Sequence, residues 1–269
     1  MKNIILIISL FSVVILSSCE KVVDIDLKTS ESTVVVEGLI TDQSGMSYVK
    51  LTMSDAYFNA QQAKKVTNAE VKVSDGNTTM NFTQVQPGVY KPDANFAGTT
   101  GRTYSLTVTV DGKVFTSQST LPSVTPIDSI TYKYFPENNA DGKDSGYYVY
   151  ASFNEPAGLG NNYKVDLYQN NISKVERPAD LILFDDKYID GRYATDWELP
   201  YALEAGDSIT LKMYSLDKAG FDFYSAMLDL ADAGGLFGKT PANLPTNIKG
   251  DAFGYFGASA ITVKSVNIK

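Results

Sequence analysis

The sequence predicts a mostly β protein made of two β-sandwich domains, the second of which carries one amphipathic helix. Asp-Gly pairs at residues 75–76 and 111–112 stand between segments in which apolar and polar residues alternate, as in β-hairpins. Further alternating segments, separated by turn residues, continue to the C-terminus. Only one stretch, near residues 218–232, repeats its apolar residues convincingly at a helical spacing.

The chain begins with the pattern of an exported protein. Lys2 precedes an apolar run over residues 4–16, which is too short to cross a bilayer as a helix. The run ends in LSSC at residues 16–19, which resembles the bacterial lipobox. This resemblance implies cleavage before Cys19, with a diacylglycerol and an N-acyl group on Cys19 as a stable anchor. We therefore expect a lipoprotein signal peptide at residues 1–18; an ordinary signal peptide with an incidental cysteine is the alternative.

Composition excludes several kinds of site. Cys19 is the only cysteine, and the chain has no histidine. Catalytic Ser-His-Asp and Cys-His sites, zinc sites of the usual ligands and disulfides within the chain are therefore excluded. The net charge of −8 argues against a nucleic-acid partner. We expect no cofactor other than the covalent lipid on Cys19.

The sequence of the first half of the mature chain predicts a tether followed by a β-sandwich. Residues 19–30 are polar with a few aliphatic residues, and we interpret them as a lipid-anchored tether. From Thr33 the pattern becomes β, so we place the N-terminal sandwich at residues 31–124. Its hairpins AEVKVS-DG-NTTMNF and YSLTVTV-DG-KVFTSQ each predict a type I′ turn. The spacing of these segments resembles prealbumin-like and carboxypeptidase-regulatory-like sandwiches, and we expect both sandwich domains to be of the immunoglobulin/prealbumin-like kind.

Two prolines, Pro122 and Pro126, mark the predicted domain boundary. After them we place a C-terminal β domain at residues 125–269, with strand candidates that include YYVYASF, YKVDLYQ and DSITLKMYSL.

The predicted helix near residues 218–232 lies late in this second domain. Asp217 precedes it as a capping residue. Phe221, Tyr224 and Leu228 recur at i, i+3 and i+7, so they share one face and predict that this face packs inward.

Several segments occur in an order that resembles a known family. They are CEKVVDIDL after the lipobox, then VVVEGLITD, YVKLTMSDAYF and PIDSI, then LFDDKYIDG, GDSITLKMYSLD and NLPTNIKGDAFGYFGA. From about Cys19 to the C-terminus, this layout resembles the lipoprotein family catalogued as domain of unknown function 4249. No catalytic residue is attached to that family.

The resemblance implies a location and a partner. Such lipoproteins occur in outer membranes of the Bacteroidetes type and are commonly encoded beside TonB-dependent receptors, whose accessory proteins they are suspected to be. It implies that this chain is lipid-anchored in the cell outer membrane beside a TonB-dependent β-barrel. CEKVVD carries two acidic residues near the lipid, faintly like the acidic export tags of surface lipoproteins, so we expect a surface-exposed body rather than a periplasmic one.

Three carboxylates lie close together in FDDKYIDG, at Asp185, Asp186 and Asp190. Carboxylate oxygens near a turn-forming glycine are typical of calcium loops, so these residues are weak calcium candidates. Their spacing departs from the EF-hand pattern D-x-[DN]-x-[DN]-G, and an exposed acidic turn is the favoured alternative.

Aromatic residues supply the candidates for ligand binding. The chain has 17 tyrosines and one tryptophan, and exposed rings can stack on sugars or on a partner protein. RYATDWELPYALEAGD has no clear period, so Tyr193, Trp197 and Tyr201 are the ligand-binding candidates. Core packing is the favoured alternative for tyrosines elsewhere, because alternation places about half of those in YYVYASF inward.

The tripeptide DSI occurs at residues 128–130 and 207–209 and matches a pattern of Bacteroidetes-type O-glycosylation. So short a pattern arises easily by chance, and both copies lie at predicted strand starts. Turn chemistry is therefore the favoured interpretation at Ser129 and Ser208.

These observations favour a non-catalytic protein over an enzyme. The main hypothesis is an outer-membrane lipoprotein that binds ligand as the accessory of a TonB-dependent transporter in nutrient uptake. One alternative is a surface module for carbohydrate or peptide binding or for adhesion. The other is a glycoside hydrolase, which needs only two carboxylates. Its candidates are Glu155, Asp185, Asp186, Asp196 and Glu198.

Overall fold

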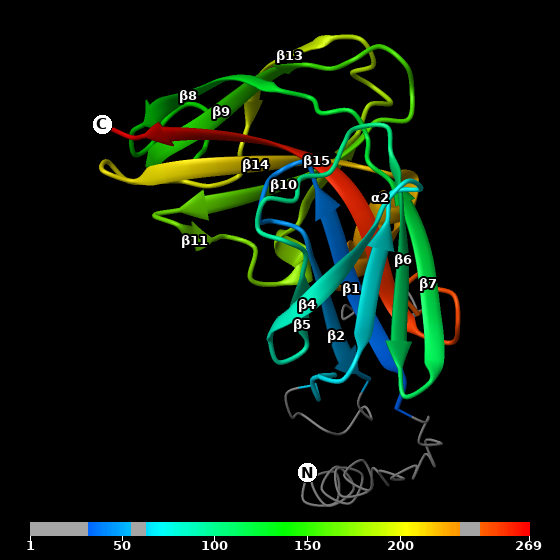
Figure 1. The fold of residues 1–269 in the computed structure, drawn as a ribbon. Coiled ribbons are helices and arrows are strands. Elements are labelled where there is room, and N and C mark those ends of the chain that lie inside the picture. The colour runs from blue at the N-terminus through cyan, green and yellow to red at the C-terminus, as the bar shows by residue number, and fades with distance from the viewer. Residues whose placement is uncertain (1–31, 55–62, 232–242) are drawn as a thin grey trace, which may run out of the picture. The chain divides into compact units, whose positions relative to one another are not determined.

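The computed structural model describes residues 32–54, 63–231 and 243–269 of the chain. The predicted signal peptide, the tether and Cys19 lie outside the described residues, as does residue 232 at the end of the predicted helix. Within the described ranges the chain is mostly β, with two sheets and one α-helix, which confirms the predicted fold class (Figure 1).

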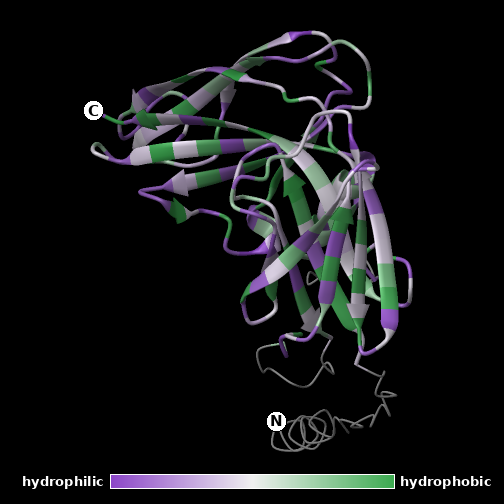
Figure 2. Cartoon of the chain, viewed as in Figure 1, coloured by the Kyte–Doolittle hydropathy of each residue, from purple (hydrophilic) through white to green (hydrophobic). Residues whose placement is uncertain are grey.

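Seven strands form the N-terminal half of the described chain. Buried and more exposed residues alternate along them, most regularly in TYSLTVTV, and Figure 2 shows the same banding of hydropathy. The buried faces meet in one core that includes Val36, Leu51, Val73 and Leu106. The strands are β1 (Val34–Thr41), β2 (Tyr48–Met53), β3 (Glu70–Ser74), β4 (Thr79–Gln86), β5 (Val89–Lys91), β6 (Thr103–Val110) and β7 (Lys113–Thr120).

Both predicted hairpins form, but only one has the predicted turn. Val110 pairs with Lys113, and Asp111 and Gly112 both have positive φ, as a type I′ turn requires. The other Asp-Gly pair lies in a four-residue loop between Ser74 and Thr79. There the Oδ1 of Asp75 accepts the N–H groups of the two residues that follow Gly76. This local bond replaces the type I′ turn, so the predicted turn type is wrong at Asp75.

The C-terminal half packs two layers of strands over a second core. The smaller sheet has the order β13-β9-β8, and the opposite layer is built from β10, β14 and the end of β15. Buried apolar residues from both layers, among them Val149, Phe153, Leu167 and Leu211, fill the space between them. The strands are β8 (Ile127–Phe135), β9 (Gly146–Asn154), β10 (Asn162–Gln169), β11 (Ile172–Ser173), β12 (Ile182–Asp185), β13 (Tyr193–Glu198), β14 (Ser208–Leu216) and β15 (Phe253–Asn267), with a short 3-10 turn at Pro178–Asp180.

Strand β15 belongs to both halves. Its first part, residues 253–259, runs parallel to β1, and its second part, residues 260–267, runs antiparallel to β14 (Figure 1). Gly254 permits the first pairing, because an added Cβ would lie 2.8 Å from the carbonyl carbon of Val36. The result is a continuous sheet in which β10, β14, β15, β1 and β2 are neighbours. The predicted domain boundary near residue 124 would require each half to fold on its own, and it stays a prediction.

The single described α-helix, α2 (Lys218–Ala231), confirms the predicted one. Asp217 caps it, since its Oδ1 accepts the N–H of Gly220 at 2.8 Å. The same carboxylate accepts the hydroxyls of Tyr255 at 2.8 Å and of Ser119 at 2.5 Å, so the helix start is fastened to β15 and β7. Among the described residues, no helix has the length and apolar character needed to cross a membrane.

Candidate functional site

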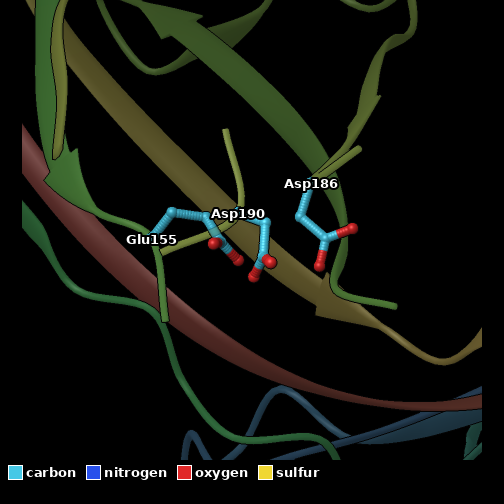
Figure 3. A group of neighbouring side chains, drawn as sticks. All are labelled: Glu155, Asp186 and Asp190. Carbon is cyan, nitrogen blue, oxygen red and sulfur yellow. The ribbon is translucent and has the colours of Figure 1, made fainter. Parts of the chain in front are cut away.

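Three carboxylates meet between the end of β9 and the turn after β12. Glu155, Asp186 and Asp190 each place an oxygen within 4.8 Å of the others (Figure 3). Asp185 is exposed and outside this group, and its Oδ1 accepts the N–H of Lys187 instead. Adjacent residues at a strand end point in opposite directions, so Asp185 and Asp186 do not converge. The predicted trio is thus corrected: Glu155 stands where Asp185 was expected.

Two of these carboxylates hold backbone N–H groups of the loop at residues 156–161. The Oδ2 of Asp186 accepts the N–H groups of Gly160 and Asn161, each at 2.8 Å. The Oδ1 of Asp190 accepts the N–H of Gly158 at 2.6 Å. Hydrogen bonds to ionised carboxylates are strong, so they fasten the loop to the turn that follows β12.

Glu155 is 1% exposed and completes this connection. Its Oε1 accepts hydrogen bonds from the side chains of Asn161 at 2.8 Å and Tyr163 at 3.2 Å. Its Oε2 accepts the N–H of Gly191 at 2.8 Å. Glu155, Asp186 and Asp190 are the described residues that could hold a calcium ion, which takes 6–8 oxygen ligands. Their hydrogen bonds already give these carboxylates a structural role, and calcium binding stays a prediction.

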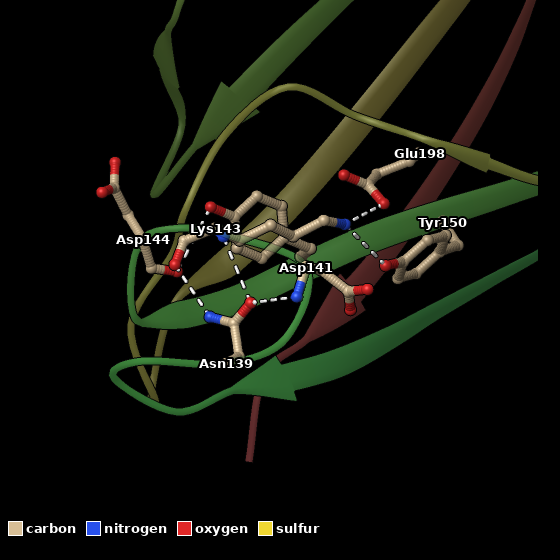
Figure 4. Close-up of polar contacts among 7 residues, drawn as sticks. Asn139, Asp141, Lys143, Asp144, Tyr150 and Glu198 are labelled. Atoms are coloured by element: carbon tan, nitrogen blue, oxygen red, sulfur yellow. Dashed lines mark hydrogen bonds and ion pairs between the residues drawn. The ribbon is translucent and has the colours of Figure 1, made fainter.

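A second polar group surrounds Lys143 in the loop between β8 and β9 (Figure 4). Its ammonium forms an ion pair with Glu198 and lies 4.3 Å from the ring centroid of Phe135 and 4.8 Å from that of Tyr148. The hydrogen bond with Glu198 raises the pKa of Lys143, and the same bond lowers the pKa of Glu198. Glu198 is therefore an ionised partner of Lys143 and does not join Glu155 or Asp186.

The three predicted ligand-binding aromatics do not form one surface. Tyr193 is 53% exposed, whereas Trp197 is half-buried and packs on Phe184, with ring centroids 5.1 Å apart. A β-bulge lies between Ala194 and Trp197, with Asp196 at φ 50°. One extra residue in a strand shifts the following side chains to the other face, so Tyr193 and Trp197 point in opposite directions.

Tyr201 also packs against the C-terminal core, and Lys174 lies 5.6 Å from its ring. Of the three candidates, only Tyr193 is therefore exposed enough to stack freely on a ligand. The role of all three in binding stays a prediction.

A group of tyrosines that the sequence did not single out lines a cavity of about 260 Å³. It lies on the face of β10, β14, β15, β1 and β2 that is opposite the two cores, beside α2. We call it the tyrosine cavity. Its tyrosines are Tyr48, Tyr168, Tyr214, Tyr224 and Tyr255.

The charges inside the tyrosine cavity are paired with each other. The Nζ of Lys164 lies 2.5 Å from the Oδ1 of Asp166, and these side chains are 10% and 14% exposed. The same ammonium lies 4.0 Å from the ring centroid of Tyr214, a cation–π contact. Burial lowers the pKa of Lys164, and the charge of Asp166 opposes that change.

The hydroxyls of the cavity remain protonated. Burial raises the pKa of Tyr48, Tyr214 and Tyr255 far above the usual value of a tyrosine, and neighbouring carboxylates raise it further. Tyr48 donates to Glu37 at 2.8 Å, and Tyr255 donates to Asp217. The cavity therefore presents aromatic faces and neutral hydroxyls around one internal ion pair.

A further hollow, of about 360 Å³, runs over β6 and β7. It is lined by short polar side chains such as Ser105, Thr107 and Gln118, with Lys249 at one side. It has no aromatic residue in its lining, and ligand sites are usually lined by apolar and aromatic groups. The tyrosine cavity is therefore the better candidate for a binding site.

The second DSI tripeptide begins β14 and is part of a tightly bonded turn. Asp207 accepts hydrogen bonds from the side chains of Gln169 and Asn170 and from the N–H of Glu204. The bond from Glu204 is the main reason why the pKa of Asp207 is lowered. These contacts agree with the interpretation of the Ser208 segment as a turn. Ser129, in the other DSI tripeptide, lies within strand β8 and not in a turn.

Comparison with other proteins adds a family but no described activity. No curated protein matches this chain. Residues 20–265 match the family described as domain of unknown function (DUF4249), which is nearly the whole chain after the LSSC segment. The cavity, the carboxylate group and all of the β body except its last few residues therefore lie within the matched region, and the chain belongs to the DUF4249 family.

Proposed function

We propose that this chain is an outer-membrane lipoprotein that binds a small ligand as the non-catalytic accessory of a TonB-dependent transporter in nutrient uptake. The tyrosine cavity is the observation that carries the proposal, because it offers aromatic rings and hydroxyl groups for contact with a ligand. Its two charged lining residues, Lys164 and Asp166, pair with each other, so neither is free to act as an acid or a base. The lipobox ahead of the body supplies the anchor at Cys19.

The carboxylates favour binding over hydrolysis. A glycoside hydrolase needs one carboxyl group as a proton donor and a second as nucleophile or base. Glu155 is buried and both of its oxygens accept hydrogen bonds, whereas Glu198 is paired with Lys143. Neither residue is free to take either role in this arrangement.

The test is purification of the natively lipidated chain in a mild detergent, followed by mass spectrometry of the proteins that accompany it. We expect a TonB-dependent β-barrel in stoichiometric amount. The Cys19→Ala variant, which cannot be lipidated, is the matched control. We expect this variant to be lost from the membrane fraction and not to co-purify with the barrel. Repeated recovery of the wild-type lipoprotein alone would contradict the accessory role and favour an independent surface carbohydrate- or peptide-binding module.

The side of the membrane can be tested in the same strain. If the body faces the cell surface, added protease degrades it in intact cells while a periplasmic marker protein survives. Protection of the body until the outer membrane is broken would place it in the periplasm instead.

A further inference from the structure

The tyrosine cavity is built where strands far apart in the sequence become neighbours. Tyr48 comes from β2, Lys164 and Asp166 from β10, Tyr214 from β14, and Ser259 from β15. These strands are adjacent in one sheet because β15 pairs with both β1 and β14. Most of the lining therefore stands on strands, with Tyr224 on α2 and Met46 in the loop between β1 and β2. Strands fix the spacing of their contact groups before any ligand binds.

The balance of charge in the cavity selects against charged ligands. Lys164 and Asp166 are its two charged lining residues, and they satisfy each other at 2.5 Å. An anion or a cation would have to separate this pair, which would leave the partner charge buried and uncompensated. A neutral ligand avoids that cost.

The polar groups that remain are hydroxyls. Five tyrosines and Ser259 contribute them. The hydroxyls of Tyr48 and Tyr255 already donate to Glu37 and Asp217, so toward a ligand these two act as acceptors. Ser259 is 1% exposed, and its Oγ has no hydrogen-bond partner among the described residues. A buried hydroxyl without a partner is costly, and a ligand hydroxyl in the cavity would satisfy it.

From these features we propose that the tyrosine cavity binds a small, uncharged, hydroxyl-rich ring, the chemistry of a neutral monosaccharide. Its aromatic side chains can stack on the apolar face of such a ring, and its hydroxyls can form hydrogen bonds with the hydroxyl groups at the edge of the ring. A cavity of about 260 Å³ admits one ring rather than a longer chain. The inference rests on the proposed function, since it names the ligand class of that binding protein.

The test measures binding of named sugars to the full-length lipidated chain, in a detergent without a sugar headgroup. Glucose, galactose, mannose and N-acetylglucosamine are titrated separately, with saturation-transfer NMR as the readout. We expect at least one to bind with a Kd of about 1 mM or below. Gluconate, glucosamine and leucine, which are anionic, cationic and zwitterionic, should bind at least about tenfold more weakly.

Variants tie any binding to the cavity. Ser259→Ala should weaken binding about tenfold while the protein stays folded, because it removes a hydroxyl that has no internal partner. Met46→Trp should abolish binding by filling the cavity, which Met46 lines. Tyr188→Phe, at an exposed tyrosine outside the cavity lining, is the control and should leave the Kd unchanged.

Three results would overturn the inference: no neutral sugar binds, a charged analogue binds more tightly, or Ser259→Ala and Met46→Trp leave the Kd unchanged. These results are distinct from failure of the proposed function. A TonB-dependent barrel that co-purifies with a chain unable to bind sugars would support the accessory role and refute the ligand class. Sugar binding without a barrel would do the reverse.

Discussion

Tyr255 lies across Gly257, two residues further along the same face of β15, and an added Cβ at Gly257 would lie 2.7 Å from its Cζ. On the helix side, an added Cβ at Gly220 would lie 3.0 Å from the same atom. Two glycines thus make room for the ring, and Asp217 holds its hydroxyl. One wall of the tyrosine cavity is therefore set by the absence of two side chains.

Gly257→Ala is expected to lower the free energy of unfolding by about 1–3 kcal/mol, because the new methyl group overlaps the ring of Tyr255. Urea unfolding measures the loss. In a Tyr255→Ala background the same substitution should cost less than about 0.5 kcal/mol, because the clash is gone. An equal loss in both backgrounds would show that the effect comes from the backbone and not from Tyr255.

Asp217→Ala is expected to destabilise the protein by about 2–3 kcal/mol. It removes the helix cap at Gly220 and the acceptor of two partly buried hydroxyls, those of Tyr255 and Ser119. The matched control in the same helix is Asp222→Ala. Asp222 forms an exposed pair with Lys218, at 2.6 Å, so this change should cost less than about 0.5 kcal/mol. Chemical unfolding followed by far-UV circular dichroism compares the two, and similar losses would refute the special role of Asp217.

Features carried by neighbouring residues could be predicted from the sequence. The helix follows from Asp217 and from the spacing of Phe221, Tyr224 and Leu228, all within a few turns. The hairpin at Asp111 follows from alternation and a two-residue turn. Local competition explains the failures, since a side-chain bond reshaped the loop at Asp75 and a bulge separated Tyr193 from Trp197.

The tyrosine cavity could not be predicted because it depends on long-range pairing. Alternation in YKVDLYQ does place Lys164, Asp166 and Tyr168 on one face of a strand. It does not reveal that β14, β15, β1 and β2 continue this face. For the same reason the sequence does not add Glu155 to the calcium candidates Asp186 and Asp190, although the fold brings the three carboxylates together.

Stability should fall steeply above about pH 10, because several buried tyrosines have a raised pKa in the folded state. Burial raises the pKa of Tyr48, Tyr214 and Tyr255 above the value near 10 that they have when unfolded. Above that pH the unfolded chain binds fewer protons than the folded one, so rising pH favours unfolding. Below about pH 10 the contribution of these tyrosines is fully present. Burial lowers the pKa of Lys164, so this group makes stability rise with pH instead. It is one group against three tyrosines, so the net change is still a loss of stability.

Each such tyrosine should lower the free energy of unfolding by about 1.4 kcal/mol per pH unit above pH 10. Urea unfolding between about pH 8 and pH 11 measures the slope. Tyr214→Phe should reduce it by one tyrosine's share, whereas Tyr193→Phe, at a 53% exposed position, should leave it unchanged. An identical slope in wild type and Tyr214→Phe would refute the assignment.

Glu155→Gln is expected to cost about 1–3 kcal/mol in the absence of any metal. A neutral amide accepts weaker hydrogen bonds than a carboxylate, and its NH₂ would face the N–H of Gly191 or the donors on Asn161 and Tyr163. Asp185→Asn, outside the group, is the control and should change stability by less than about 0.5 kcal/mol. Because the carboxylates already accept N–H groups, EDTA should leave the wild-type Tm unchanged in scanning calorimetry. A Tm that rises with added calcium in wild type, but not in Glu155→Gln, would instead establish the group as a calcium site.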